Sequence, residues 1–237
     1  MLLKPWLRRH ALTLAILFAG VLLPLYGFGT LAEDVAKNEV FPFDKTLLLF
    51  AHGHASVTLD QLMIFFTHAG SAVALVPFNL LVFGILLYRG QRHRATFWLL
   101  ATAGAALLNL LAKHAFARTR PDLWISILPE NTYSFPSGHA MQSMAVGVAL
   151  MALTWTSRWR WPMLMFSSLF VLFVGCSRVY LGVHYPSDIL AGWTASLAWV
   201  IGLANAFRIV SRTHQLGLAE DLDIVGGADS QPDTRER

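Results

Sequence analysis

The 237-residue sequence is poor in charged residues and has a single cysteine. Charged residues make up 14% of the chain, against about a quarter in a typical soluble domain, and 55% of the residues are hydrophobic. A chain this apolar cannot hide its surface in one water-soluble core, so the composition excludes an ordinary soluble domain and predicts an integral membrane protein. The lone Cys176 excludes an internal disulfide and makes no metal site by itself, and we expect a small, buried apolar residue there.

The sequence also has no internal repeat, no low-complexity run and only a small formal net charge of +4. Most of its cations lie in short segments between apolar stretches. The positive-inside rule accounts for cations in such places, so the charge does not indicate a nucleic-acid partner.

Six apolar stretches are long enough to cross a bilayer, which takes about 20 residues. They cover residues 11–29, 69–88, 95–116, 137–155, 161–178 and 187–208. The first stretch has the alternative of a cleaved signal peptide, since Gly29 to Ala32 resembles a cleavage site, but its length and Pro24 favour a retained span. We therefore expect an all-α membrane domain of six transmembrane helices over residues 1–212.

Clusters of basic residues predict the orientation of this domain. Four alternate segments carry such clusters: Lys4/Arg8/Arg9, Arg89/Arg92/Arg94, Arg158/Arg160 and Arg208/Arg212. The positive-inside rule places these segments and both termini in the cytoplasm. Segments 28–68, 113–136 and 177–187 then lie on the periplasmic or extracytoplasmic face of the plasma membrane.

Two regions lie outside the predicted spans. Residues 40–68 have an apolar stripe broken by polar residues, which predicts two short amphipathic helices in the outer interface. Their His52, His54 and His68 are candidate metal ligands, although the polar side of an interfacial helix is the favoured interpretation. Residues 213–237 are polar and acidic, so we expect a disordered cytoplasmic tail.

Three polar clusters interrupt the apolar chain, and all of them fall in the predicted outer segments. They cover residues 113–121, 136–139 and 177–188. Ionisable groups at the ends of membrane spans are costly to keep there, so they indicate a functional site. Besides His114 and Arg118, the clusters together supply two histidines, a carboxylate and three cations, which is the set that cleavage of a phosphate ester requires.

The third cluster contains the expected nucleophile, His184, and its partner, Asp188. Pro186 suits the first position of a helix, which puts Asp188 in the first turn, where the helix dipole favours a carboxylate. A carboxylate bonded to one imidazole nitrogen fixes the tautomer and leaves the other nitrogen free to attack. Taken alone, the pair also fits a helix-capping Asp beside an interfacial His.

The second cluster predicts a helix start that binds an anion. Pro136 at the first position and the small Gly138 leave backbone N–H groups accessible, and Ser137 adds a hydroxyl donor. His139 lies in the same turn and is the expected general acid, which protonates the leaving oxygen. Taken alone, these four residues also fit an ordinary helix start.

Lys113, Arg120 and Arg178 are the cations expected to hold the phosphate. Lys113 and Arg120 are seven residues apart, so they share a face if the helix persists between them. Guanidinium forks match phosphate oxygens, and lysine supplies a point charge. The alternative role of such cations is contact with lipid headgroups, and we assign only that role to His114 and Arg118.

A metal site is the remaining chemical alternative. His139, His184 and Asp188 form a set that can hold zinc. Three cations converging on the same place would oppose a dication, so we expect no metal and no other cofactor.

In this order and spacing, the clusters resemble the type-2 phosphatidic acid phosphatase superfamily, membrane lipid phosphatases related to the vanadium haloperoxidases. The family pattern is Lys, six residues, Arg-Pro; then Pro-Ser-Gly-His; then Ser-Arg, five residues, His, three residues, Asp, and residues 113–188 match it without departure. The resemblance implies a six-helix membrane bundle with an outer-facing site and no metal. It also implies His184 as nucleophile, Asp188 as its partner, His139 as acid, and as phosphate ligands Lys113, Arg120, Ser137, Gly138 and Arg178.

The resemblance further implies a phosphatase that hydrolyses the terminal phosphate of an outer-leaflet lipid through a phosphohistidine intermediate. Undecaprenyl diphosphate, phosphatidylglycerophosphate and phosphatidate are the candidate substrates, and the sequence does not choose among them. A lipid A phosphatase or phosphotransferase, a non-catalytic phosphate-lipid transporter or binder, and a purely structural membrane protein are the alternatives. A binder would need the cations but not a His–Asp pair with a second histidine.

Overall fold

The computed structural model describes residues 11, 14–15, 17–39 and 41–209, and every regular element in this part of the chain is helical. The elements are the π-helical turn η1 (Phe18–Leu22), α2 (Leu23–Ala36), α3 (Pro42–Gly53), α4 (Val57–Ala69), α5 (Ala72–Tyr88), α6 (Arg92–Phe116), α7 (Gly138–Thr154), α8 (Arg160–Tyr180) and α9 (Pro186–Ala206). The prediction of an all-α fold is confirmed. The predicted tail 213–237 and most of the chain before Leu17 lie outside the described residues.

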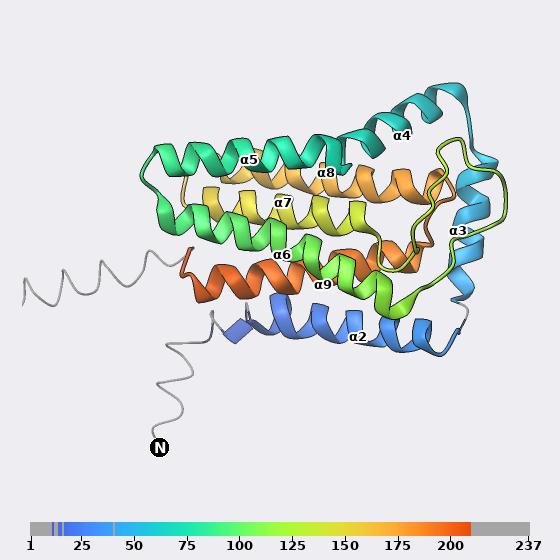
Figure 1. Cartoon of the computed structure of the whole chain (residues 1–237), viewed down its shortest axis with the longest axis horizontal. Coiled ribbons are helices and arrows are strands. Elements are labelled where there is room, and N and C mark those ends of the chain that lie inside the picture. Colours follow the sequence, from blue (N-terminus) through green and yellow to red (C-terminus); the bar gives the residue numbers. More distant parts are fainter. Residues whose placement is uncertain (1–10, 12–13, 16, 40, 210–237) are drawn as a thin grey trace, which may run out of the picture.

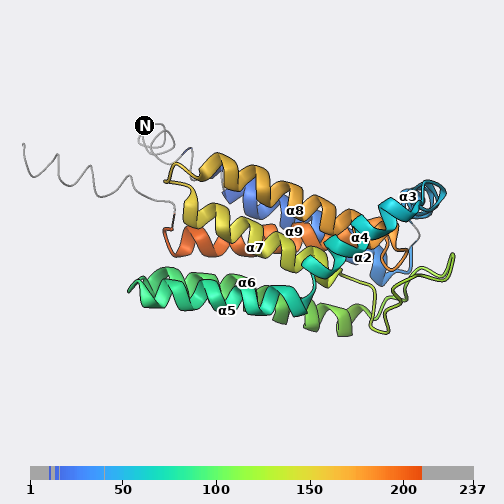
Figure 2. The ribbon, with the colours of Figure 1, turned by 90° about the horizontal axis from the view of Figure 1, so that it is seen from above.

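The long helices run side by side, with α7 inside the bundle (Figures 1 and 2). α7 packs against α6, α8 and α9, while α2 packs on α9 and α5 packs on α6. Small residues such as Ala140, Ser143 and Ala145 line the buried surface of α7. Small side chains let helix backbones approach closely, which is a main source of helix association in a bilayer.

Gly192 shows how tightly the starts of α7 and α9 are packed. A Cβ atom at this position would lie 2.9 Å from the carbonyl oxygen of Ser137 and 3.1 Å from the Cβ of Ala140. No larger side chain fits without moving one helix away from the other. The close approach brings the second polar cluster against the third.

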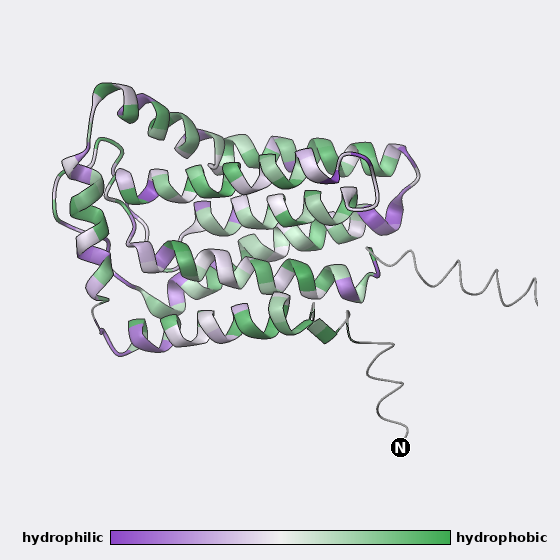
Figure 3. Ribbon diagram, turned by 180° about the vertical axis from the view of Figure 1, so that it is seen from behind, coloured by the Kyte–Doolittle hydropathy of each residue, from purple (hydrophilic) through white to green (hydrophobic). Residues whose placement is uncertain are grey.

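Most residues along the long helices are hydrophobic, and polar residues are commoner near the helix ends (Figure 3). Many of the large apolar side chains are exposed on the outside of the bundle, among them Leu80, Leu107 and Phe166. Within the described residues, α6, α8 and α9 have the length and hydropathy to cross a membrane. A fourth span is added if α4 and α5, which bend by 44° at a short break, are counted as one. α7 has 17 residues and coincides with the predicted span 137–155, and the bounds of α6, α8 and α9 agree with their predicted spans to within a few residues.

Segment 40–68 forms two helices, as predicted, but these two helices occupy different positions relative to the bundle. α3 lies across one end of the bundle, whereas α4 runs on from α5 and packs along α8 (Figure 1). Thr67 of α4 exchanges a buried 2.8 Å hydrogen bond with Ser177 of α8. The bend between α4 and α5 can lie close to α8 because Gly70 has no side chain: a Cβ there would lie 2.5 Å from Val174.

The three polar clusters lie at the same end of the bundle as α3. They follow α6 and α8 at their C-terminal ends and begin α7 and α9 at their N-terminal ends (Figure 1). The other basic segments lie at the opposite end, at the α5–α6 and α7–α8 links and after α9. Their described arginines are Arg89, Arg92, Arg94, Arg158, Arg160 and Arg208. The helix arrangement therefore assembles one polar end from clusters spread over residues 113–188 and from α3.

The prediction that Cys176 is buried is wrong. Its neighbours Gly175 and Ser177 face the inside of the bundle, so the intervening Cys176 side chain faces outward and is exposed. It lines an apolar cavity of about 390 Å³ bounded by α3, α4, α8 and α9.

Candidate active site

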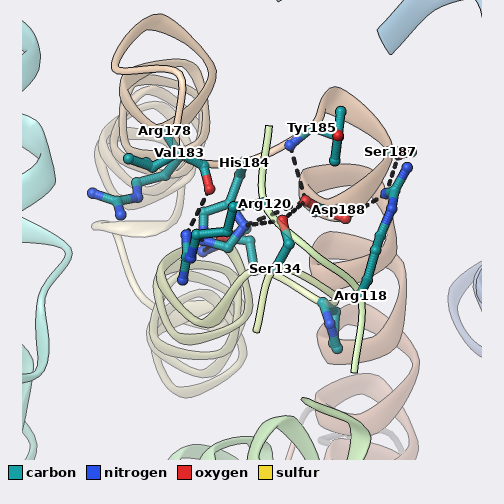
Figure 4. Close-up of polar contacts among 12 residues, drawn as sticks. Arg118, Arg120, Ser134, Arg178, Val183, His184, Tyr185, Ser187 and Asp188 are labelled. Carbon is teal, nitrogen blue, oxygen red and sulfur yellow. Dashed lines mark hydrogen bonds and ion pairs between the residues drawn. The ribbon is translucent and has the colours of Figure 1, made fainter. Parts of the chain in front are cut away.

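His184 lies in the short link between α8 and α9, and only 1% of it is exposed. Its Nε2 is 3.1 Å from Nη1 of Arg120, and its Nδ1 is 3.4 Å from Oδ2 of Asp188 (Figure 4). A guanidinium can only donate hydrogen bonds, so Nε2 must accept and Nδ1 carries the proton. The ring therefore turns its N–H toward the carboxylate and its lone pair toward the arginine.

The surroundings keep the His184 ring neutral. Burial lowers the pKa of His184 well below its ordinary value, and the charges of Arg120 and Arg178 lower this pKa further. Glu130 acts in the opposite direction but does not outweigh them. A neutral imidazole near pH 7 is the form in which this histidine can act as a nucleophile.

Asp188 is the third residue of α9 and is fully buried. Its carboxylate accepts a hydrogen bond from the backbone N–H of Tyr185 at 2.9 Å and another from the hydroxyl of Ser134. Nη1 of Arg118 lies 2.6 Å from its other oxygen, on the side away from His184 (Figure 4). The carboxylate that faces His184 is thus held from three further directions.

Arg118, predicted only to contact lipid headgroups, instead belongs to the site. α6 ends at Phe116, and Ala117 adopts a left-handed conformation with φ of 44°, which turns the chain back toward the bundle. Arg118 then reaches both Asp188 and the buried Asp44 of α3, the latter at 3.1 Å. His114, by contrast, is exposed, and its Nδ1 bonds the Leu110 carbonyl of its own helix at 2.8 Å, with no hydrogen bond to the site among the described residues.

Asp44 connects the crosswise helix α3 to the start of α9. Its two carboxylate oxygens accept hydrogen bonds from the backbone N–H and the hydroxyl of Ser187, at 2.9 and 2.6 Å. Ser187 also lies 2.8 Å from Nη1 of Arg118. Asp44, Arg118 and Asp188 form a continuous charged chain that ends at His184.

The early end of α6 also changes how Lys113 and Arg120 meet. The helix does not persist between them, so they do not share a helix face. Both instead bind the same stretch of the following loop: Lys113 donates to the carbonyl of Tyr133 at 2.7 Å, and Arg120 donates to the carbonyl of Thr132 at 2.6 Å. The hydroxyl of Thr132 accepts from both side chains.

Arg178, on the last turn of α8, has 1% of its side chain exposed and forms an ion pair with Glu130. Its Nη1 lies 3.3 Å from the hydroxyl of Thr67, while its buried Nε has no hydrogen-bond partner among the described residues. Glu130 also pairs with Arg120 at 2.7 Å. Although burial raises the pKa of Glu130, the charges of Arg178 and Arg120 outweigh burial and lower that pKa to about 2.

The second cluster caps the start of α7. The helix begins at Gly138, with Ser137 as its N-cap, so Pro136 lies one position before the cap and is not the first helical residue as predicted. The backbone N–H of Ser137 donates to the carbonyl of Asp188 at 3.1 Å, which joins this start to that of α9. His139 lies in the first turn, where the charges of Arg178 and Glu130 act on it.

Comparison with known proteins identifies the domain that carries this site. Residues 94–211 match the family model described as the PAP2 superfamily. The chain carries a PAP2 superfamily domain. The matched residues include all three clusters, which confirms the family resemblance of the sequence.

Curated relatives of this PAP2 protein are phosphatases. Phosphatidylglycerophosphatase B of Bacillus subtilis is 28% identical over 175 residues, covering 72% of this chain and 86% of the relative. The undecaprenyl-diphosphatase of Sulfolobus acidocaldarius is 28% identical over 163 residues, covering 67% and 75%. The PAP2 protein is thus a membrane hydrolase of the lipid phosphatase type.

Solved structures show the same fold. The transmembrane PAP2-type phosphatidylglycerolphosphate phosphatase of Bacillus subtilis superimposes with a TM-score of 0.71 at 26% identity, covering 81% of this chain and 98% of that one. Aquifex aeolicus LpxE superimposes with a TM-score of 0.55 at 20% identity, covering 70% and 96%, which shows a shared fold alone.

The structure of the PAP2 domain brings together most of the predicted site residues and adds others. Lys113, Arg120, Arg178, His184 and Asp188 form one connected network, and Ser137 joins it through its backbone. Sequence reasoning missed Asp44, Arg118, Glu130 and Ser134. Two signals in the sequence were available. One is the carboxylate of Asp44 in an otherwise apolar stretch, and the other is a second arginine two residues before Arg120.

The histidines of segment 40–68 do not gather into a site. His52 stacks on Trp124 with ring centroids 4.2 Å apart, and Nδ1 of His54 bonds the Phe50 carbonyl at 2.8 Å. Within residues 17–39 and 41–209, no three His, Cys, Asp or Glu side chains are grouped so that they could hold a metal ion.

Proposed function

We propose that this protein removes the terminal phosphate of a membrane lipid by forming a phosphohistidine on His184. One observation carries the proposal: the His184 lone pair faces a guanidinium, while the N–H side of the ring faces a buried carboxylate. This is the arrangement of a nucleophilic imidazole beside an anion-binding group. A helix-capping Asp beside an interfacial His would not place Arg120 on the opposite ring nitrogen.

The proposed substrates are undecaprenyl diphosphate, phosphatidylglycerophosphate or both, with phosphatidate as a third. The names of the Bacillus and Sulfolobus relatives support the first two. The exposed apolar side chains along the helices support a lipid, because the tail of such a substrate can stay in the bilayer while its phosphate enters the polar end.

In the proposed first step, Nε2 of His184 attacks phosphorus and the bond from phosphorus to the leaving oxygen breaks. His139 donates a proton to that oxygen. Asp188 stabilises the positive charge that develops on the His184 ring, since the Nδ1 proton already points at it. Water then attacks the phosphohistidine and gives a proton to His139, the P–N bond to His184 breaks, and phosphate leaves with both imidazoles restored.

Cations and N–H donors stabilise the negative charge on the equatorial oxygens during both steps. Lys113, Arg120 and Arg178 supply the charge. At the start of α7 the hydroxyl of Ser137 and the backbone N–H of Gly138 supply donors, because the N–H of Ser137 already bonds the Asp188 carbonyl. The unpartnered Nε of Arg178 supports this assignment. A buried donor without a partner costs about 1–3 kcal/mol, and a bound phosphate oxygen would remove that cost.

We propose a six-span topology with the site on the outer face and both termini in the cytoplasm. The polar end holds the three clusters, and the opposite end holds the described arginines of the basic segments: Arg89, Arg92, Arg94, Arg158, Arg160 and Arg208. This charge distribution supports the orientation through the positive-inside rule.

Phosphate release by the purified protein tests the proposed function. The panel is undecaprenyl diphosphate, phosphatidylglycerophosphate, phosphatidate and diacylglycerol pyrophosphate. His184→Ala should lower turnover of every substrate by at least about a thousandfold, because the nucleophile is lost. His114→Ala is the matched control, since this exposed histidine lies outside the network, and it should turn over like wild type.

Lipid binding without phosphate release by the wild-type protein would favour the transporter or binder alternative, and full turnover by His184→Ala would refute the mechanism.

The same assay in sealed right-side-out vesicles tests the topology. A short-chain substrate added outside should be hydrolysed equally well before and after permeabilisation. Hydrolysis that appears only after permeabilisation would place the site on the cytoplasmic face.

A further inference from the structure

Glu130 occupies the place between two arginines in which the proposed function needs a phosphate. We propose that Glu130 is a built-in competitor of the phosphate group and sets the affinity of the site for it. The inference rests on the proposed function, and it concerns a residue that lies outside the three clusters.

The Glu130 carboxylate is held between two arginine side chains. One carboxylate oxygen lies 2.7 Å from Nη2 of Arg120, and the other pairs with Nη2 of Arg178. Arg120 also contacts the Nε2 of His184 that is proposed to attack phosphorus. The carboxylate therefore bridges the two guanidinium groups beside the nucleophile.

A phosphate and the Glu130 carboxylate cannot use these N–H groups at the same time. Arg120 and Arg178 have 12% and 1% of their side chains exposed and are each held by further contacts. Glu130 is 29% exposed and belongs to the loop of residues 117–137, which contains no helix. When a phosphate enters, the side chain that gives way is thus Glu130.

A resident carboxylate has a physical use in this site. Without it, the guanidinium groups of Arg120 and Arg178, with 12% and 1% of their side chains exposed, would lose their carboxylate partner, and unpaired buried charge is costly. Such a site would also retain the phosphate product strongly. Because the pKa of Glu130 is held at about 2, its carboxylate is ionised at every pH near neutrality and competes continuously.

Simple competition makes a quantitative prediction. If the site is open only in the fraction of molecules in which Glu130 has swung away, every ligand that needs the arginines loses affinity by the same factor. Removing the competitor should therefore strengthen the binding of substrate, of orthophosphate and of vanadate equally. The turnover number should stay the same, or fall if release of phosphate becomes rate-limiting.

The test is Glu130→Gln, which removes the charge and keeps the shape. We expect the KM for the lipid phosphate and the inhibition constants of orthophosphate and vanadate to fall together, by about tenfold or more. Glu130→Ala should change all three in the same direction, because it also frees both arginines. Asp122→Asn is the control: this exposed carboxylate of the same loop loses the same charge and should change the three constants less than twofold.

Constants that rise or stay unchanged in both Glu130 variants would overturn the inference, and so would a change in only one ligand. Equilibrium binding of orthophosphate, measured by calorimetry on the same variants, requires no turnover. It should tighten by the same factor. Failure here, with turnover still lost in His184→Ala, would refute the role of Glu130 and leave the proposed function intact.

Discussion

At the scale of single residues, the site depends on a series of buried charged side chains, each of which contacts the next. Asp44 holds Arg118, Arg118 holds Asp188, and Asp188 faces the imidazole of His184. Each charge is compensated by the next, which is how charged groups remain tolerable in a buried place. Contacts with Arg118 and Ser134, both outside α9, also fix the orientation of the Asp188 carboxylate.

Arg118→Gln should separate positioning from phosphate binding. Without the guanidinium, Asp188 keeps its place less well and orients His184 poorly, so kcat should fall at least about tenfold. KM should change little, because Arg118 contacts carboxylates rather than the phosphate ligands Lys113, Arg120 and Arg178. The measurement is steady-state kinetics of phosphate release.

Arg89→Gln is the matched control for that variant, since this exposed arginine lies at the opposite end of the bundle. Asp44→Asn should shift kcat in the same direction as Arg118→Gln but by less, because Asp44 acts on Asp188 only through Arg118 and Ser187. An unchanged kcat in Arg118→Gln, or a change confined to KM, would show that Arg118 does not position Asp188.

The roles of single residues were predictable only where they belong to a compact pattern. The spacing of His184 and Asp188 on a helix start was enough to bring them together. Asp44 and Arg118 meet across 74 positions of sequence, and Glu130 reaches Arg178 across 48. Nothing local distinguishes such residues from ordinary interfacial charges, so the sequence alone left them out.

At the scale of secondary structure elements, the site is built where helix ends meet. α7 and α9 start side by side, joined by the hydrogen bond from Ser137 to Asp188 and by the close contact at Gly192. The anion-binding helix start and the His–Asp pair are therefore placed by the same packing. A displacement of either helix would separate the proposed acid, His139, from the proposed nucleophile.

Gly192→Ala tests this dependence. The new Cβ would lie 2.9 Å from the Ser137 carbonyl, so the helix starts must move apart, at a cost of about 1–3 kcal/mol. We expect a lower thermal stability in detergent and a turnover reduced about tenfold or more. In Gly202→Ala on the same helix, the new Cβ would meet no atom of another described segment within 4 Å, so this variant should resemble wild type. Equal behaviour of the two variants would contradict this packing.

Hydropathy predicted the long helices well. The bounds of α6, α8 and α9, including the end of α6 at Phe116, follow from long apolar runs, because a span must fill the bilayer. Hydropathy did not predict the left-handed turn at Ala117 or the contacts that Arg118 then makes with distant segments. The continuation of α5 by α4 depends on packing against α8, which no local pattern encodes.

At the scale of the whole molecule, four helix ends and one crosswise helix enclose a single polar region at one end of an apolar bundle. The sequence predicted that the three clusters would share this end, since alternating spans return every second connection to the same side. It did not predict that α3 would be tied to the site by Asp44. These two hydrogen bonds join α3 to the start of α9 at this end of the bundle.

The central claim is that His184 carries the phosphoryl group during turnover. The most direct measurement is to mix the wild-type protein with a lipid phosphate substrate, stop the reaction in alkali, which preserves phosphohistidine, and locate the phosphate by peptide mass spectrometry. We predict phosphate on His184 in the wild-type protein and none in His184→Ala. Phosphate on another residue, or turnover without any phosphorylated histidine, would contradict the account.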